Sequence, residues 1–162
     1  STADCVPILL YDKEKQVIAA IHAGWRGTVG HIVEKTIEVM KSQYGSEGKD
    51  MVACIGPSIS LESFEVGDEV YAAFEEAGFD MSCIARKYAK WHLDLWEANR
   101  IQLLAHGILP EHIEVAGICT YQHPDDFFSA RRLGIKSGRI LSGIVMNETE
   151  NRSICDWKVV AE

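Results

Sequence analysis

Cys5 and His22 are the first residues whose types and spacing suggest shared chemistry. Cys5 directly precedes an apolar run at residues 6–11. His22 lies near the end of a second apolar run at residues 16–23. The polar stretch at 12–15 predicts a β-hairpin. With a turn there, positions whose numbers add up to about 27 face each other, so the thiol and the imidazole are expected to be near neighbours.

A neighbouring thiol and imidazole allow three interpretations. They can form a cysteine nucleophile and its base. They can equally supply two of the three protein ligands of a catalytic zinc, with water at the open position. The third interpretation is a buried structural cysteine beside a hydrogen-bonded histidine, and the residue types alone favour it.

The segment at residues 22–28 joins the end of a strand to the start of a helix. Its two glycines allow a ligand to approach the backbone, and Thr28 is expected to cap a helix whose first N–H groups would face an anion. Arg26 could add a forked contact to phosphate, and Trp25 offers a stacking face. An ordinary strand-to-helix turn would explain the same glycines.

A third stretch, at residues 123–139, gathers positive charge in an otherwise acidic chain. Its four cations are Arg131, Arg132, Lys136 and Arg139. Such a cluster could bind phosphate. If Phe127 and Phe128 lie on a strand, they point to opposite faces, and Phe128 could stack on a base. A salt-bridged surface turn with core aromatics is the alternative.

Composition limits the class of protein. A chain of 162 residues suits one domain, here residues 1–162. The net charge of −8 argues against nucleic-acid binding and against docking on anionic membranes. No apolar run approaches the about 18 residues of a membrane span. The five cysteines are widely spaced and odd in number, which favours reduced cytoplasmic thiols over a disulfide framework.

The elements expected to position these residues mix strands and helices. The expected strands lie at residues 6–11, 16–23, 51–55, 113–118, 127–128, 139–146 and 153–155. The expected helices run from Thr28 to a stop at Gly45, over 66–78, and from a cap at Asp94 to about His106. Hairpins and crossovers together predict an α+β, or layered α/β, fold.

Several motifs in this order resemble one known family. They are TADCVP at residues 2–7, HAGWRG at 22–27, IGPSIS at 55–60 and FFSARR at 127–132, with Leu93-Asp94-Leu95, Cys119-Thr120 and Gly138-Arg139 between or after them. The chain strongly resembles the YfiH-like family, also called laccase-domain or polyphenol oxidase proteins. The resemblance covers nearly all of the 162 residues. It implies an α/β/β/α sandwich with mixed sheets, of the CNF-toxin/YfiH-like type.

The resemblance also implies an activity. Members of the family are zinc-dependent enzymes that phosphorolyse adenosine, inosine, guanosine and methylthioadenosine, and they can deaminate adenosine. Their metal is held by one Cys and two His, of which Cys5 and His22 match two. The remaining His belongs to an upstream motif with no counterpart here, so the domain is expected to lack its N-terminal part and to bind metal poorly as it stands.

Within the activity that the resemblance implies, the charge, aromatic character or position of further residues makes them candidates. Arg26 and Arg131 become candidates for binding phosphate, and Trp25 and Phe128 for contacting the nucleoside. Asp4 is a candidate proton donor only because it is next to Cys5. Ser58 stands where many relatives carry Cys, and Ala130 where many carry Tyr, as the resemblance implies.

Two rival functions stay open. Cys5 and His22 could form a cysteine hydrolase, or the domain could bind a partner without catalysis. A copper laccase needs many histidines, typically in His-x-His pairs, whereas this chain has six histidines and no such pair. Zinc, which the resemblance implies, is expected, and copper is the less favoured metal. The expected partners are purine nucleosides and phosphate, with the oligomeric state left open.

Overall fold

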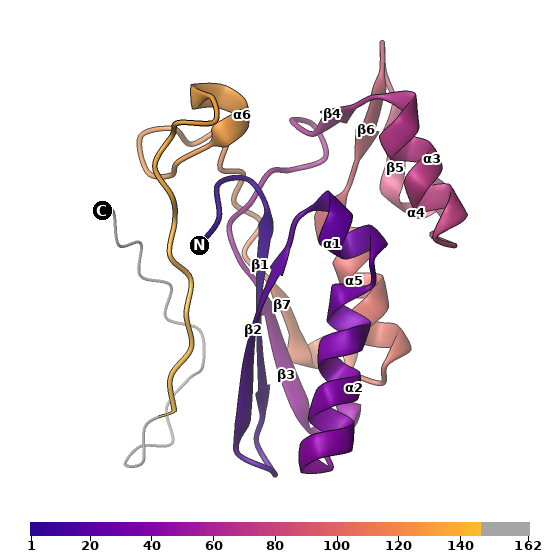
Figure 1. The fold of residues 1–162 in the computed structure, drawn as a ribbon, viewed down its shortest axis with the longest axis vertical. Coiled ribbons are helices and arrows are strands. Elements are labelled where there is room, and N and C mark those ends of the chain that lie inside the picture. Colours follow the sequence, from indigo (N-terminus) through magenta and orange to yellow (C-terminus); the bar gives the residue numbers. More distant parts are fainter. Residues whose placement is uncertain (147–162) are drawn as a thin grey trace.

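The central sheet has four strands in the order β2-β1-β3-β7. A computed structural model describes residues 1–146, so the strand expected at 153–155 lies outside the described part. β1 (Val6–Asp12) pairs antiparallel with β2 (Val17–Ala23) and with β3 (Met51–Ile55), and β3 pairs in parallel with β7 (Ile113–Val115). In Figure 1 the strands of this sheet run along the long axis of the molecule.

The hairpin register differs from the expected one by two residues. Pro7 pairs with His22 and Asp12 with Val17, so the loop spans residues 13–16. Asp12 explains the shift, because its Oδ1 accepts hydrogen bonds from the amides of Glu14 and Lys15 at 2.9 Å each and so begins the turn one residue later.

A shift of two residues keeps every side chain on its own face of the hairpin. Extended beyond its last pair, Val6 with Ala23, the register brings Cys5 level with Gly24. Cys5 and His22 are therefore diagonal neighbours on one face rather than a directly facing pair.

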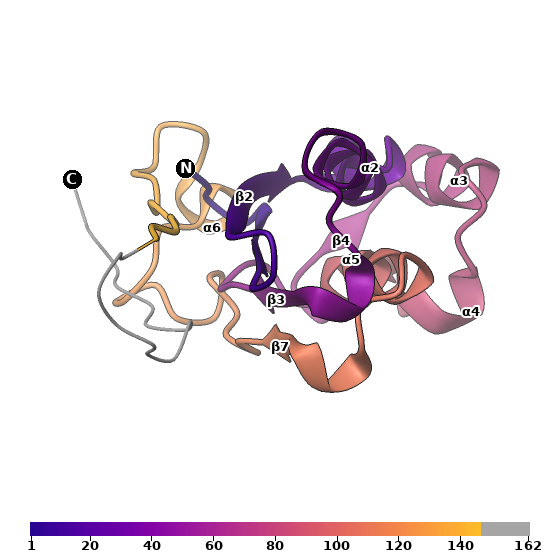
Figure 2. The same ribbon diagram turned by 90° about the horizontal axis from the view of Figure 1, so that it is seen from below.

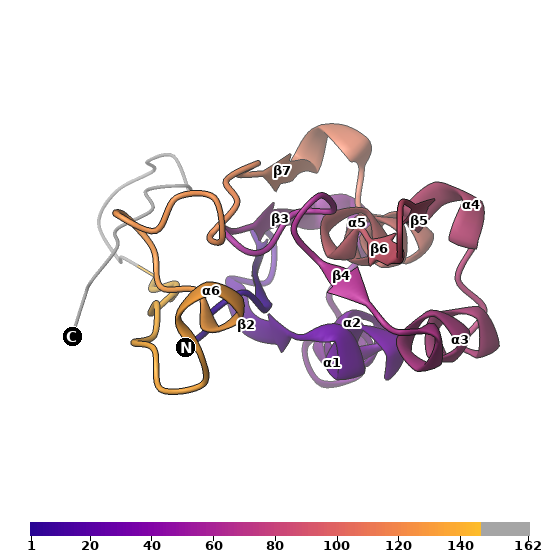
Figure 3. The ribbon, with the colours of Figure 1, turned by 90° about the horizontal axis from the view of Figure 1, so that it is seen from above.

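Helices cover one face of this sheet. α1 (Trp25–Val29), α2 (Ile32–Tyr44) and α5 (Leu95–Ala105) lie on one side, and the chain that follows α6 (Ala130–Leu133) lies on the other (Figures 2 and 3). The expected helix start at Thr28 is wrong, because α1 already begins at Trp25 and His31, with φ of 55°, separates it from α2.

Two expected helix ends are confirmed. Gly45 ends α2 with φ of 70°, a left-handed conformation that suits glycine. Asp94 caps α5, because its Oδ1 accepts a hydrogen bond from the amide of Glu97 at 2.9 Å.

A second, three-stranded sheet lies at one end of the molecule, where Figure 1 shows it at the upper right. Its order is β4 (Glu65–Val66), β6 (Trp91–Leu93) and β5 (Ala85–Lys87), and all its pairs are antiparallel. Two helices flank it, α3 (Asp68–Glu76), which confirms the helix expected at 66–78, and α4 (Met81–Ile84). Two short 3₁₀ turns, Gly48–Asp50 and Pro110–His112, complete the elements of the described residues.

Two expected strands are wrong. Residues 127 and 128 lie in a turn that leads into α6. The strand expected at 139–146 is reduced to one antiparallel bridge between Ile140 and Thr2, with hydrogen bonds of 2.8 and 2.7 Å. An apolar run forms a strand only where its backbone N–H and C=O groups find a partner strand, and residues 139–146 find one only at Ile140.

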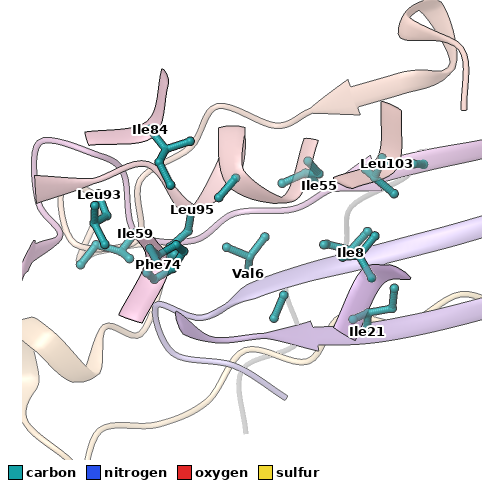
Figure 4. Packing of buried hydrophobic residues seen from close by; sticks show 14 of the residues in the cluster. Val6, Ile8, Ile21, Ile55, Ile59, Phe74, Ile84, Leu93, Leu95 and Leu103 are labelled. Atoms are coloured by element: carbon teal, nitrogen blue, oxygen red, sulfur yellow. The ribbon is translucent and has the colours of Figure 1, made fainter. Parts of the chain in front are cut away.

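One continuous hydrophobic core joins the two sheets. Figure 4 shows Val6, Ile8 and Ile21 of the hairpin in one cluster with Leu95 and Leu103 of α5, and Phe74, Ile84 and Leu93 continue that cluster at its other end. The mixed sheets and the separate helices confirm the α+β fold class. Across residues 1–146, no helix is both long and apolar enough to cross a membrane.

The cysteines depart from expectation at one position. Cys54 is disulfide-bonded, contrary to the expectation of reduced thiols. Cys5, Cys83 and Cys119 are free thiols.

Candidate metal and nucleoside site

The Cys5 thiol and the His22 imidazole converge above Gly24. A Cβ placed on Gly24 would lie 2.8 Å from Cys5 Sγ and 3.8 Å from His22 Nε2. A contact of 2.8 Å is too short for a real Cβ, so the missing side chain of Gly24 leaves room for the thiol. Both donor atoms therefore lie close to one point at the end of the hairpin.

Electrostatics distinguishes the two donors. Burial raises the pKa of the Cys5 thiol, the neighbouring Asp4 raises it further, and Arg139 opposes both. Burial lowers the pKa of the His22 imidazole. The imidazole is thus held in the neutral form that binds metals, whereas the thiol needs a cation beside it to ionise.

A thiol and an imidazole form a donor set that fits zinc, which binds both sulfur and nitrogen. Within residues 1–146, no group of three His, Cys, Asp or Glu side chains is arranged to hold a metal ion. The convergence at Gly24 therefore fits two ligands of a zinc site and leaves the third to be supplied from elsewhere.

A hollow of about 90 Å³ lies beside His22, on the face of the sheet away from the helices. Its lining residues are Ser1, Thr2, Pro7, Leu9, Ala20, Ile21, His22 and Ser142. Pockets for small ligands usually measure about 300–1,000 Å³, so a nucleoside would extend out of this hollow.

Asp4 fixes the loop that carries Cys5. Its Oδ1 accepts a hydrogen bond from Thr120 Oγ1 at 2.8 Å, and its Oδ2 accepts one from the amide of Arg131 at 2.7 Å. Its backbone adopts the left-handed region with φ of 82°. Since both carboxylate oxygens are already hydrogen-bonded and the residue is buried, this geometry favours a positioning role over proton donation.

The aromatic and cationic candidates form two separate groups. The guanidinium of Arg26 lies 4.3 Å above the ring of Trp25, next to Gly24. Arg131 Nη1 donates to the carbonyl of Glu65 at 2.8 Å, and its guanidinium lies over the ring of Phe64. Phe128 packs against Gly138, whose built Cβ would lie 2.7 Å from the ring.

Arg139 is the cation that sequence reasoning undervalued. Its charge acts on the Cys5 thiol, and the bridge between Thr2 and Ile140 holds the adjacent backbone beside the start of the chain. Its Nη1 donates to the carbonyls of Ser137 at 2.5 Å and Gly138 at 3.0 Å. The sequence showed Arg139 only as one of four clustered cations, and nothing local indicated which of them would approach Cys5.

Residues 1–147 match the family described as multi-copper polyphenol oxidoreductase laccase. The chain belongs to this family. This membership confirms the resemblance that the motifs at residues 2–7 and 22–27 indicated.

Curated relatives within the family carry names from purine metabolism. A "Purine nucleoside phosphorylase" of Bacteroides thetaiotaomicron is 62% identical over 151 residues, which are 91% of this chain and 56% of that protein. "Adenosine deaminase RL5", from an unknown prokaryotic organism, is 46% identical over 147 residues, covering 89% of this chain and 56% of that protein. The chain thus spans about half the length of the curated relatives it matches.

Solved structures of the family share the fold. The hypothetical protein YfiH of Bacillus licheniformis superposes with a TM-score of 0.76 at 32% identity, over 81% of this chain and 50% of that chain. YlmD of Geobacillus stearothermophilus gives a TM-score of 0.75 at 35% identity, over the same shares. The fold is therefore the YfiH-like one that the resemblance implied.

Proposed function

We propose that this chain carries the Cys5 and His22 half of a zinc-dependent purine nucleoside phosphorylase site. The observation that carries the proposal is the convergence of Cys5 Sγ and His22 Nε2 at 2.8 and 3.8 Å from the built Cβ of Gly24. The names of the relatives support the substrate class, which we take as adenosine, inosine, guanosine and methylthioadenosine. By the family resemblance the third ligand is a histidine, and no histidine in residues 1–146 joins Cys5 and His22 in a group that could hold a metal ion.

In this proposal each residue has a defined task. Cys5 and His22 hold the zinc, which when bound supplies a Lewis acid that polarises an oxygen. Asp4 keeps the Cys5 loop in place through Thr120 and Arg131. The domain is a single YfiH-like unit over residues 1–162, and we place the protein in the cytoplasm.

The reaction needs cations for phosphate and a surface for the purine. A phosphate oxygen forms a bond to the ribose anomeric carbon while the bond from that carbon to the purine nitrogen breaks. The purine takes the bonding electrons and a proton as it leaves. Arg26, Arg131 and Arg139 hold the phosphate and offset developing negative charge, and Trp25 and Phe128 contact the base.

Adenosine deamination is a second activity of the same site. The relative named adenosine deaminase RL5 favours it. In this reaction the oxygen of water bonds to the amine-bearing carbon of the purine, and ammonia leaves after taking a proton. Only phosphorolysis requires phosphate, so the two activities are separable.

The rival functions find less support. A cysteine nucleophile works as a thiolate, whereas burial and Asp4 raise the pKa of Cys5. A copper laccase would need several imidazoles together, whereas the converging donors are one thiol and one imidazole. If the domain only binds a partner, no product should form from a purine nucleoside.

The test is to incubate the full-length, zinc-loaded protein with adenosine, with and without phosphate. Adenine that forms only with phosphate supports phosphorolysis, and inosine that forms without phosphate supports deamination. If neither product forms, the proposal is wrong. Cys5→Ser should lower zinc content and activity together, whereas Cys83→Ser, at an exposed free thiol, should change neither. Zinc retained with lost activity would instead indicate a cysteine nucleophile.

A further inference from the structure

A buried chain of hydrogen bonds leads from α5 to Gly24. Asn99, which has no exposed surface, donates from Nδ2 to Thr28 Oγ1 at 3.2 Å. Thr28 is equally buried, and its Oγ1 donates to the carbonyl of Gly24 at 3.1 Å. The hydroxyl therefore uses its one proton and one of its lone pairs to join α5 to the residue beneath Cys5 and His22.

Further polar contacts surround Thr28, although Asn99 Oδ1 and Gln102 Oε1 are buried without a hydrogen-bond partner among the described residues. The same Gly24 carbonyl accepts the backbone amide of Thr28 at 2.8 Å. The second N–H of the Asn99 amide donates to the carbonyl of Leu95 at 2.7 Å, so both its donors are used. Gln102 adds a longer contact, with Nε2 at 3.4 Å from the Thr28 carbonyl. Buried polar groups of this kind cost stability when a partner is removed, which makes the network specific.

α1 has only five residues, so it cannot hold its own position. Isolated helices need about 12–15 residues to form in water even with favourable sequences. Gly24 directly follows β2, and the other end of α1 is tied to α5 through the hydrogen bonds that Thr28 makes with Asn99 and Gln102. A small shift of Gly24 would move the surface against which Cys5 Sγ packs at 2.8 Å from the built Cβ.

We infer that Asn99 and Thr28 are positioning residues for the Cys5 and His22 site. The inference rests on the proposed function for the meaning of that site, but not for its geometry. Asn99 acts through the Thr28 hydroxyl on the Gly24 carbonyl, and Gly24 in turn sets how closely the thiol and the imidazole approach each other. Neither residue touches the substrate.

The test uses the alkylation rate of Cys5 as a measure of local geometry. Iodoacetamide is added to the full chain at fixed pH, and mass spectrometry follows Cys5 relative to the exposed Cys83. Thr28→Val keeps the shape of the side chain but removes the hydroxyl. It should raise the ratio of Cys5 to Cys83 alkylation by about fivefold, as expected when a buried hydrogen bond is lost. Thr28→Ser keeps the hydroxyl and should leave the ratio within about twofold.

Thr36→Val is the matched control. Thr36 Oγ1 also donates to the carbonyl four residues earlier, that of Ile32 at 2.7 Å, but in α2. It should lower the free energy of unfolding in urea without changing the alkylation ratio. The inference would be overturned if Thr36→Val raised the alkylation ratio as much as Thr28→Val does. It would also be overturned if a folded Thr28→Val left that ratio unchanged.

If Thr28→Val does not fold, Asn99→Ala replaces it, since Thr28 then keeps its bond to Gly24. A rise in the ratio supports the inference, and an unchanged ratio in the folded variant contradicts it. Alkylation needs no turnover. A protein that forms no purine products but shows the predicted ratios would therefore refute the proposed function and leave the positioning role intact.

Discussion

Cys5 lies between two regions that are held together in different ways. On one side, the β1–β2 hairpin and α1 bring His22 and Gly24 to it through contacts over fewer than 25 residues of chain. On the other side, Asp4 is hydrogen-bonded to Thr120 and Arg131, which are 116 and 127 residues away. Local patterns in the sequence predict the first region and carry almost no information on the second.

The strongest test of the distant region is Asp4→Ala. It removes two hydrogen bonds to a buried carboxylate and places alanine at φ of 82°. We expect the free energy of unfolding in urea to fall by about 3 kcal/mol. Asp4→Asn tolerates the backbone conformation and should cost less than Asp4→Ala. Equal stability of Asp4→Ala and the unmodified protein would show that α6 is held by other contacts.

Gly24→Ala tests the local region. The new Cβ would lie 2.8 Å from Cys5 Sγ, so the thiol must move, at a cost of about 1–3 kcal/mol in unfolding free energy. Zinc content per chain should fall with it. Gly143→Ala is the control, since no atom lies within 4 Å of its built Cβ. Full zinc binding by Gly24→Ala would contradict the geometry proposed for the site.

Asp12 gives the hairpin a pH dependence. Burial raises the pKa of this carboxyl, but the nearby Ser46 hydroxyl and the hydrogen bonds from the amides of Lys15 and Glu14 outweigh burial and lower it. The pKa of Asp12 is lower in the folded chain than in the unfolded chain, where it is about 3.9. The ionised carboxyl therefore stabilises the fold at pH values above about 3.9, and this stability is lost as the pH falls through the folded pKa.

The free energy of unfolding in urea should therefore fall between pH 7 and pH 2, and it should fall less steeply in Asp12→Asn. Asp125→Asn, at an exposed turn residue, should keep the slope of the unmodified protein. Identical slopes in all three proteins would show that the Asp12 turn does not stabilise the hairpin through its charge.

Of these substitutions, Arg131→Gln should have the smallest effect on the free energy of unfolding. The backbone amide of Arg131, which the substitution keeps, makes the contact to Asp4. The exposed guanidinium loses its bond to the Glu65 carbonyl and its place over the Phe64 ring, which we expect to cost less than about 1 kcal/mol together. Arg132→Gln, which loses a bond to the Tyr121 carbonyl, is the matched comparison. A loss as large as that of Asp4→Ala would place the stabilising contact in the side chain.

The same contrast explains what the sequence could predict. The hairpin, the Asp94 cap and the Gly45 stop follow from residues that act within one turn of chain, and each is present. The register was two residues off because the Asp12 side chain displaces the turn.

The rest depends on residues that meet only after folding. Phe127 and Phe128 look like a strand, yet Ser129 caps α6 directly after them, and Asp4 accepts from the same helix. Asn99 is hydrogen-bonded to Thr28, 71 residues away in the sequence, and no hydrophobic periodicity of the sequence predicts that contact. Arg139 approaches Cys5 only because Ile140 pairs with Thr2.

The hydrogen bond between Asp4 and the amide of Arg131 also sets an order of events during synthesis. The hairpin with Cys5 and His22 leaves the ribosome before residue 131 does, and a hairpin forms within microseconds. The Cys5 loop cannot take its final shape until residue 131 has followed, several seconds later at about 5–20 residues per second. During that interval the thiol has its imidazole neighbour but not the loop that fixes it.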